Sequence, residues 1–404
     1  MMQKENLLIP AMLDAHFPLM KYAFYSRRYQ PVILNNRRDV TELGLRWVHN
    51  DMCYPCILNT GQMLGALRSG RFDPAHTRLL MPTVGDACRG SNYADMIRRA
   101  VRLAGYPQTR VMTMNLRHVD DGNQLGITPL MVWRALFSLY YGDLLLILVQ
   151  QVRPHELHRG DTNRLRDQWH ATLGRELKSC RNLRLSVLRR RFREITASFA
   201  AIPRDSTKKQ RIGLVGDLYT RYCSLGNWDI VSFLERSGCE SYTNGLSWYV
   251  LYYIDSHLRE GNPAETAVYR AAELLLTNLQ DAMIEAIRSA GFFTLPRLKT
   301  VKAEAKGAVP LDVAIGDGWL IGAEAAAYLH HADRKVLAIQ PFGCMANHVC
   351  GRGIYASVQR KCGGAVVSAD VDASGTPVNV YNRARMLIDL SVDLLDSAGS
   401  QNQL

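Results

Sequence analysis

The chain has 404 residues, of which 47% are hydrophobic and 21% are charged. This size allows two or three domains, each with its own core, and the composition is typical of a globular protein. The formal net charge is +12, and much of it lies between Arg175 and Arg211. No zinc-finger, RNA-recognition or KH-type motif accompanies these charges, so we expect no nucleic-acid partner. A solvated helix face explains them most simply, and a docking surface is the alternative.

The N-terminus, MMQKENLLIPAMLDAHF, lacks the basic region, apolar core and cleavage site of a secretory signal. The most apolar stretch, Leu130–Val152, contains Arg134 and Asp143. Because charges near the middle of a membrane span are costly, we predict a long buried helix there and no membrane partner. The nine cysteines lack the spacing of a disulfide scaffold. We therefore expect a cytoplasmic protein with free thiols, metal ligands or redox chemistry.

The first part of the chain alternates strands with helices. Strands are expected at 30–34, 77–84 and 109–115, and helices at 41–50, at 57–67 and from about 92. This alternation is typical of a parallel sheet with βαβ connections. Ligands bind beyond the carboxyl ends of strands in such sheets, and Cys88 falls at such an end.

The middle of the chain is mostly helical, at 129–152 and 165–201, and an α/β pattern restarts with a strand at 212–215. Further helices are expected at 228–237, 246–259, 264–290, through Glu324 and at 380–395, with strands at 336–339 and 365–369. The predicted fold class is α/β, with two Rossmann-like lobes of parallel sheets and a helical bridging region. The expected boundaries are residues 1–128 for the first lobe, 129–209 for the bridge and 210–404 for the second lobe.

Three cysteines share one local context, a loop that leads into a helix. Cys53 stands in NDMCYPC, Cys88 in GDACRG and Cys344 in LAIQPFGCMANHVCGRG. Free N–H groups and the dipole at a helix start favour a thiolate. Three such thiolates could hold a [4Fe-4S] cluster and leave one iron open to an exchangeable ligand. The alternative is that these cysteines are small buried hydrophobic residues.

Other residues near these cysteines allow further interpretations. Cys53 and Cys56 have the spacing of a thiol redox pair, while a zinc ribbon would need a second close pair. His348 and Arg89 are candidate catalytic residues, as an acid and as a partner for an anion. Asp217 and Glu324 are equally well explained as helix caps. Three cysteines on or beside predicted helices are interpreted as structural: Cys180, Cys223 and Cys239. The chain has no GxxxxGK[ST] motif, so we expect no ATP hydrolysis by this chain.

Five segments, taken together, resemble a known family. They are NDMCYPCILNTGQMLGAL, MPTVGDACRGSNYADMIRRA, the Tyr141-Gly142-Asp143-Leu144-Leu145 segment, RIGLVGD and IQPFGCMANHVCGRG, in this order. The chain is similar in these segments to the benzoyl-CoA reductase / 2-hydroxyacyl-CoA dehydratase superfamily, and most of all to the dehydratase-like part of CoA-substrate-specific activase-related proteins. The resemblance runs from about Asn50 to Asp389.

The resemblance implies a cluster between two lobes, held by Cys53, Cys88 and Cys344. It implies low-potential electrons from a separate ATP-hydrolysing iron–sulfur activase, used for radical dehydration or reduction, commonly of acyl-CoA thioesters. A homo- or hetero-oligomer with a related subunit is expected. Some relatives carry a double-cubane [8Fe-9S] cluster, for which Cys56, Cys350 and Cys362 would be the extra ligands. The family's activase domain is missing here, so a non-catalytic scaffold subunit that docks a catalytic paralogue is the alternative function.

Overall fold

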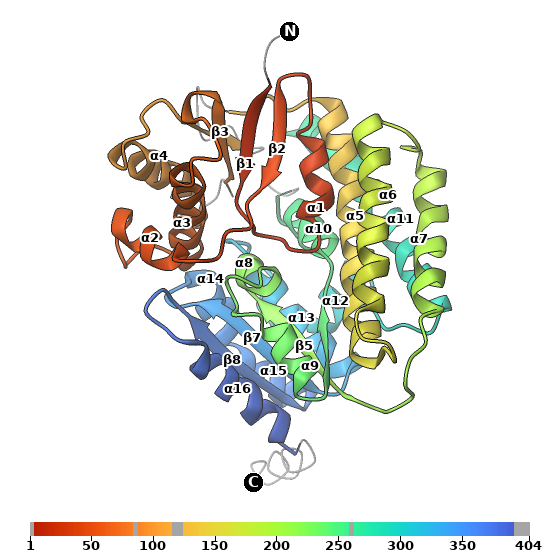
Figure 1. Ribbon diagram of the computed structural model, residues 1–404. Helices are drawn as coiled ribbons and strands as arrows, with labels where there is room; N and C mark the ends of the chain where they lie inside the picture. Colours follow the sequence, from red (N-terminus) through yellow and green to blue (C-terminus); the bar gives the residue numbers. More distant parts are fainter. Residues whose placement is uncertain (1–3, 84–87, 115–123, 258–261, 392–404) are drawn as a thin grey trace.

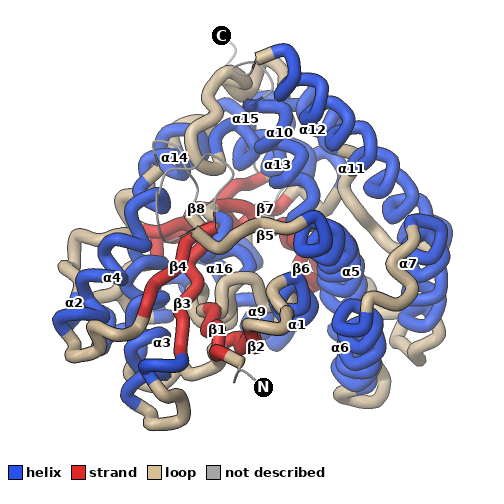
Figure 2. The backbone as a smooth tube through the Cα atoms, turned by 90° about the horizontal axis from the view of Figure 1, so that it is seen from above, coloured by secondary structure: helices blue, strands red, loops and turns tan. Residues whose placement is uncertain are grey.

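The protein is described here from a computed structural model, which covers residues 4–83, 88–114, 124–257 and 262–391 (Figure 1). Its framework consists of two separate four-stranded parallel sheets. Helices pack around both sheets, and a block of long helices lies at one side of the molecule (Figures 1 and 2). The predicted α/β class with two Rossmann-like lobes is confirmed.

The first sheet has the strand order β2-β1-β3-β4, with all neighbours parallel. Its central strand β1 pairs with both β2 and β3, through Leu7 opposite Pro31 and Leu8 opposite Leu79. The strands are β1 (Glu5–Ile9), β2 (Tyr29–Ile33), β3 (Thr77–Pro82) and β4 (Arg110–Met114), and the helices of this lobe are α2 (Val40–Trp47), α3 (Tyr54–Arg68) and α4 (Tyr93–Leu103). A core of fully buried aliphatic side chains joins the sheet to α3 and α4.

The second sheet has the matching order β6-β5-β7-β8, again with all neighbours parallel. Its strands are β5 (Gln210–Gly216), β6 (Cys239–Thr243), β7 (Lys335–Pro341) and β8 (Ala365–Val371). Its helices are α8 (Leu218–Tyr222), α9 (Ile230–Arg236), α13 (Gly318–His331), α14 (Met345–Asn347), α15 (Tyr355–Cys362) and α16 (Pro377–Asp389). The hydrophobic core of this lobe also includes Tyr54 and Leu58 of α3, so the two lobes pack directly against each other.

The helical block contains the apolar stretch that the sequence singles out. Its helices are α1 (Phe17–Met20), α5 (Pro129–Val152), α6 (Asp161–Ser179), α7 (Leu185–Ala200), α10 (Leu246–His257), α11 (Pro263–Ser289) and α12 (Leu298–Ala305). The segment Pro129–His155 is long and apolar enough to span a membrane by composition, yet 72% of its most apolar window is buried inside the protein. Its place is that of a core helix in a soluble α/β protein.

Several expected elements differ in the structure. The region 165–201, expected to be mostly helical, consists of two helices, α6 and α7. Cys180 and Asn182 adopt left-handed backbone conformations (φ 55° and 61°) that end the first helix. Cys239 lies in strand β6 and not on or beside a helix. Strands β1 and β6 are absent from the prediction. The expected strand ends at 84 and 115 and the expected helix end at 395 lie outside the described residues.

Candidate functional site

The three candidate cysteines all stand at the first position before a helical turn. Cys53 is the N-cap of α3, Cys344 is the N-cap of α14, and Cys88 precedes the 3-10 turn Arg89–Asn92. Cys88 and Cys344 follow the carboxyl ends of β3 and β7, one in each lobe. The local geometry therefore matches the strand–loop–helix context from which these residues were selected.

Contacts at Gly316 show how closely the lobes bring these cysteines together. A Cβ atom added at Gly316 would lie 3.8 Å from Cys88 Sγ and 3.4 Å from the Cβ of Ala346, two residues after Cys344. Gly316 has a φ of +59°, so it suits this close approach. Burial raises the pKa of the Cys53 thiol, and electrostatic interactions with Cys344 and Cys88 raise it further. Cys88 and the helical turn after Cys344 therefore meet at Gly316, and Cys53 interacts electrostatically with both of these cysteines.

Each of the three sulfur atoms has a hydrogen-bond donor beside it. The backbone N–H of Gly90 donates to Cys88 Sγ at 3.4 Å, and the Asn347 side-chain amide donates to Cys344 Sγ at 3.3 Å. The Tyr93 hydroxyl, at the start of α4, forms a hydrogen bond with the Cys53 sulfur. Donors to sulfur stabilise a thiolate more than a thiol, so this arrangement suits metal-bound cysteines.

Two carboxyl groups adjoin the thiols. Asp217 is half-buried and accepts the backbone N–H groups of Tyr219 and Thr220 at 3.1 and 2.8 Å, as the expected cap of α8. Asp317 is buried and accepts the Asn347 amide at 3.0 Å. Burial, followed by the charge of Asp217, raises the pKa of Asp317 to about 7. Burial and then these two carboxylates raise the pKa of Cys344 to about 12.

A buried ion pair lies behind these acids. The guanidinium of Arg221 on α8 contacts Glu324 on α13, and both side chains are 1% exposed. The Asn244 side-chain amide donates to the other oxygen of Glu324 at 3.1 Å. Glu324 stands in the middle of α13, so its interpretation as a helix cap is wrong: its carboxylate neutralises Arg221 inside the core. Two groups at this site, Asp317 and Arg221, are missing from the sequence prediction.

The candidate catalytic residues are held by their own neighbours. His348 opens a short π-helix (His348–Arg352), where its Nδ1 lies 2.8 Å from the Cys344 carbonyl oxygen and its Nε2 lies 3.6 Å from Asp370. Arg89 follows Cys88, and its guanidinium donates to the backbone carbonyl of Asp51. Each side chain is therefore engaged with a backbone oxygen, His348 with that of Cys344 and Arg89 with that of Asp51.

The remaining cysteines have different surroundings. Cys56 is fully buried in the core of the first lobe, and Cys350 is buried on the π-helix. Cys362 is the last residue of α15 and is half-buried. In the part of the chain that the structure describes, no three His, Cys, Asp or Glu side chains are grouped closely enough to hold a single metal ion.

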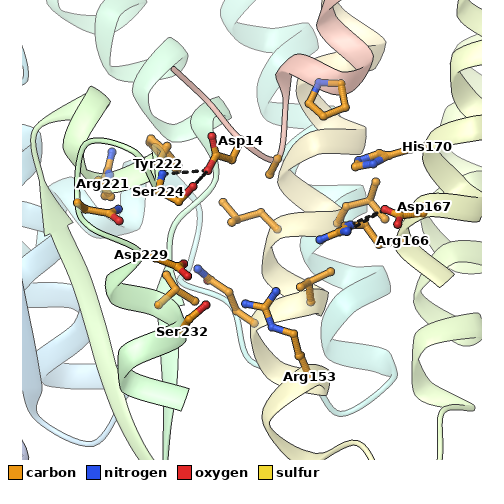
Figure 3. Close-up of a pocket in the computed structure, with 18 residues that line it drawn as sticks. Asp14, Arg153, Arg166, Asp167, His170, Arg221, Tyr222, Ser224, Asp229 and Ser232 are labelled. Atoms are coloured by element: carbon orange, nitrogen blue, oxygen red, sulfur yellow. Dashed lines mark hydrogen bonds and ion pairs between the residues drawn. The ribbon is translucent and has the colours of Figure 1, made fainter. Parts of the chain in front are cut away.

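A pocket of about 440 Å³ lies on the far side of Arg221, between α5 and α6 on one side and α8 and α9 on the other (Figure 3). Asp14, from the loop after β1, receives hydrogen bonds from the backbone N–H (2.9 Å) and the hydroxyl of Ser224. Arg166 at the opposite wall pairs with Asp167 at 2.8 Å. Arg221 and Tyr222 also line this pocket. Arg221 therefore borders this pocket while its guanidinium pairs with Glu324 inside the core.

Comparisons with protein-family models, with curated proteins and with solved structures gave no match to this chain. The three thiols and their surroundings are therefore the basis for assigning a function.

Proposed function

We propose that this chain is the iron–sulfur subunit of an ATP-dependent, low-potential reductase or dehydratase system, with a [4Fe-4S] cluster held by Cys53, Cys88 and Cys344. The observation that carries the proposal is the convergence of three N-cap thiols from distant segments and from both lobes. Thiolates are the usual ligands of iron–sulfur clusters, and hydrogen bonds to their sulfurs tune the reduction potential.

The number and placement of the thiols fit a [4Fe-4S] cluster with one open position. Cysteine thiolates hold such clusters, and here three cysteines from both lobes stand as N-caps of helical turns. Three protein ligands would leave one iron available to a substrate.

The charges around the thiols also favour a cationic group. Burial and the carboxylates of Asp217 and Asp317 raise the pKa of Cys344, so its thiolate is unstable without a compensating positive charge. Metal coordination deprotonates a thiol outright and supplies that charge. Tyr93, Gly90 and Asn347 then hold the three sulfurs in place by donating to them.

In this proposal the cluster supplies single electrons to a substrate, for which an acyl-CoA thioester is the class that the resemblance suggests. The electrons come from a separate ATP-hydrolysing activase, and the protein works in the cytoplasm as part of an oligomer. Three large apolar side chains are exposed around Cys344, with exposed fractions of 67% for Phe342, 52% for Met345 and 59% for Val349. Exposed apolar groups of this kind favour a docked protein partner beside the cluster.

The test is anaerobic reconstitution followed by iron and acid-labile sulfide analysis and electron paramagnetic resonance. We expect about four irons per chain, with large losses in Cys53→Ser, Cys88→Ser and Cys344→Ser. Cys180→Ser, which changes an exposed cysteine at the end of α6, is the control and should lose none. A wild-type chain without iron and sulfide would refute the proposal. Full iron occupancy in Cys344→Ser would refute the ligand assignment.

The same spectra distinguish the double-cubane alternative. Cys56 is fully buried in the core of the first lobe, which favours a packing role over a ligand or redox role. We expect Cys56→Ser and Cys350→Ser to keep their iron. Loss of about half of the iron in both variants would instead support a double cubane.

A further inference from the structure

A second hollow lies at the opposite edge of the second sheet, where β5 and β6 begin. It has a volume of about 680 Å³ and is lined by residues 204–209, by Arg211 of β5, by Tyr242 of β6 and by Phe292. Cys88 and Cys344, in contrast, follow the carboxyl ends of their strands. The hollow is therefore separate from the proposed cluster site and needs its own explanation.

The acidic groups of this hollow are already engaged with one another. The His155 ring lies between two carboxylates, with Nδ1 2.9 Å from Asp205 and Nε2 2.5 Å from Glu240. The Tyr242 hydroxyl donates to the other oxygen of Glu240. Hydrogen bonds from Thr207 and then from His155 hold the pKa of Asp205 down to about 2. His155, Tyr242 and Thr207 thus engage carboxylate oxygens of Asp205 and Glu240.

The hollow has more cationic than acidic side chains, and its cationic side chains form fewer close ion pairs. Within the described ranges, Arg204 and Lys208 form no ion pair. Arg211 lies 3.7 Å from Glu240, and Lys209 lies 3.9 Å from Asp205, so both ion pairs are loose. Four Lys or Arg charges thus face the two carboxylates of the hollow. The hollow has an excess of positive charge, and such a concave surface attracts multivalent anions.

Aromatic rings fix the directions of the two arginines. The guanidinium of Arg204 lies over the ring of Phe292 at 4.9 Å, and that of Arg211 lies over Tyr242 at 5.9 Å. A guanidinium stacked in this way keeps its N–H groups free at the edge, where they match the oxygens of a phosphate.

The walls of the hollow are held in place before any ligand arrives. The Gln151 side chain accepts the backbone N–H of Phe293 at 2.7 Å and donates to its carbonyl at 2.9 Å. The backbone N–H of Asp205 donates to the carbonyl of His155 at 2.8 Å, and Glu156 forms a β-bridge with Arg204. Little ordering is therefore needed on binding, which favours affinity.

We propose that this hollow binds a compound with two or more linked phosphates. Several cations around one depression recognise successive phosphates better than a single charge, and the volume fits a ligand of that size. The linked phosphates belong either to a nucleoside triphosphate or to an inorganic chain. Such a site at the far edge of the second lobe would let a phosphate compound act on the protein independently of the proposed cluster.

Isothermal titration calorimetry on the purified chain, with sodium tripolyphosphate and with ATP, tests this proposal. We expect saturable binding that weakens as salt is added. Arg211→Gln and Lys208→Gln should each weaken it about tenfold or more, since each removes charge-assisted hydrogen bonds. Lys208 is exposed, so its variant leaves the fold intact, and Arg189→Gln, an exposed arginine of α7, is the matched control.

The proposal would be overturned if neither compound bound to the chain. It would also be overturned if Arg189→Gln lowered the affinity as much as Arg211→Gln does. Equal affinities for the two compounds would assign the phosphate chain alone as the ligand. Tighter binding of ATP would assign a nucleotide, with added contact from the nucleoside. The measurement needs no iron, so its failure is distinguishable from failure of the cluster proposal.

Discussion

Asp143 is a single carboxylate that serves three partners, and its replacement by asparagine should destabilise the protein strongly. The side chain is fully buried on α5. Its Oδ1 accepts the backbone N–H of Leu246 at 2.6 Å and lies 2.7 Å from His16 Nε2, while Oδ2 accepts the N–H of Ser247 at 3.0 Å. Because Leu246 and Ser247 begin α10, this carboxylate joins α5 to two other parts of the chain.

The size of the effect follows from these contacts. Asparagine keeps one oxygen for Leu246 and His16, but it points an NH₂ group at the N–H of Ser247. A buried donor loses its charged acceptor, and the other two hydrogen bonds become neutral. Hydrogen bonds to charged groups contribute about 1.5–3 kcal/mol each, so we expect a loss of about 2–4 kcal/mol. Asp143→Ala, which removes both acceptor oxygens and with them all three hydrogen bonds, should cost more.

Urea unfolding, monitored by circular dichroism and by tryptophan fluorescence, measures this difference. The two probes must give coincident transitions before free energies of unfolding are compared. The control is Asp281→Asn. The Asp281 side chain is 44% exposed, and its ion pair with Arg297, at 3.4 Å, lies at the surface. Its cost should stay within about 0.5 kcal/mol. An Asp143→Asn variant as stable as the control would refute this account of the buried carboxylate.

Three further predictions concern buried groups. Arg221→Met should lower the free energy of unfolding by about 3–5 kcal/mol, because it leaves the Glu324 carboxylate without its counter-charge. The double variant Arg221→Met/Glu324→Met should recover most of that stability in urea unfolding. A double variant no more stable than Arg221→Met would contradict this. Gly142→Ala should cost about 1–3 kcal/mol, because the new Cβ would lie 2.3 Å from the His16 ring; an equal cost in a His16→Ala background would place the strain elsewhere. Burial lowers the pKa of His170 from 6.5 to about 4, so between these pH values the unfolded chain binds a proton that the folded protein does not bind. As the pH falls from 6.5 to 4, the free energy of unfolding should therefore decrease by at most about 3 kcal/mol, and by less if water reaches this half-buried ring. In His170→Gln, urea unfolding at pH 6.5 and 4 should show a smaller fall, and an unchanged fall would refute the assignment.

Where both ends of an element carry local signals, the sequence was sufficient to predict it. Helix α5 has the predicted bounds, Pro129–Val152, with Pro129 at its first turn and the Thr128 hydroxyl accepting the Met131 N–H at 3.2 Å. Helix α11 begins at a capping box between Asn262 and Glu265. Caps and apolar periodicity act over a few residues, and therefore remain visible in the sequence.

The two missed strands depend on distant partners. Strand β1 has the sequence ENLLI, too short for a clear period, and its central place comes from pairing with β2 and β3. Strand β6 has the sequence CESYT, which is mostly polar, yet all of it is buried. Glu240 tolerates that burial because His155, 85 residues away, is its partner. No local pattern shows such a partner.

The candidate site was predicted in the same uneven way. The context of each cysteine is local, so Cys53, Cys88 and Cys344 could each be selected from the sequence. Their approach to one another between the lobes is a tertiary feature that no local pattern shows, and only the resemblance implied it. The same holds for Asp317 and for the Arg221–Glu324 pair, whose members are 103 residues apart.

Charge balance favours the proposed metal centre over thiol–disulfide chemistry at Cys344. A reactive thiol needs a positive neighbour that lowers its pKa. Here burial and the carboxylates of Asp217 and Asp317 raise the pKa of Cys344 to about 12, and Arg221 is already neutralised by Glu324. The Cys344 thiol therefore stays protonated and unreactive at neutral pH. In our proposal a cationic centre would replace this proton, and the amide of Asn347 would then stabilise the thiolate.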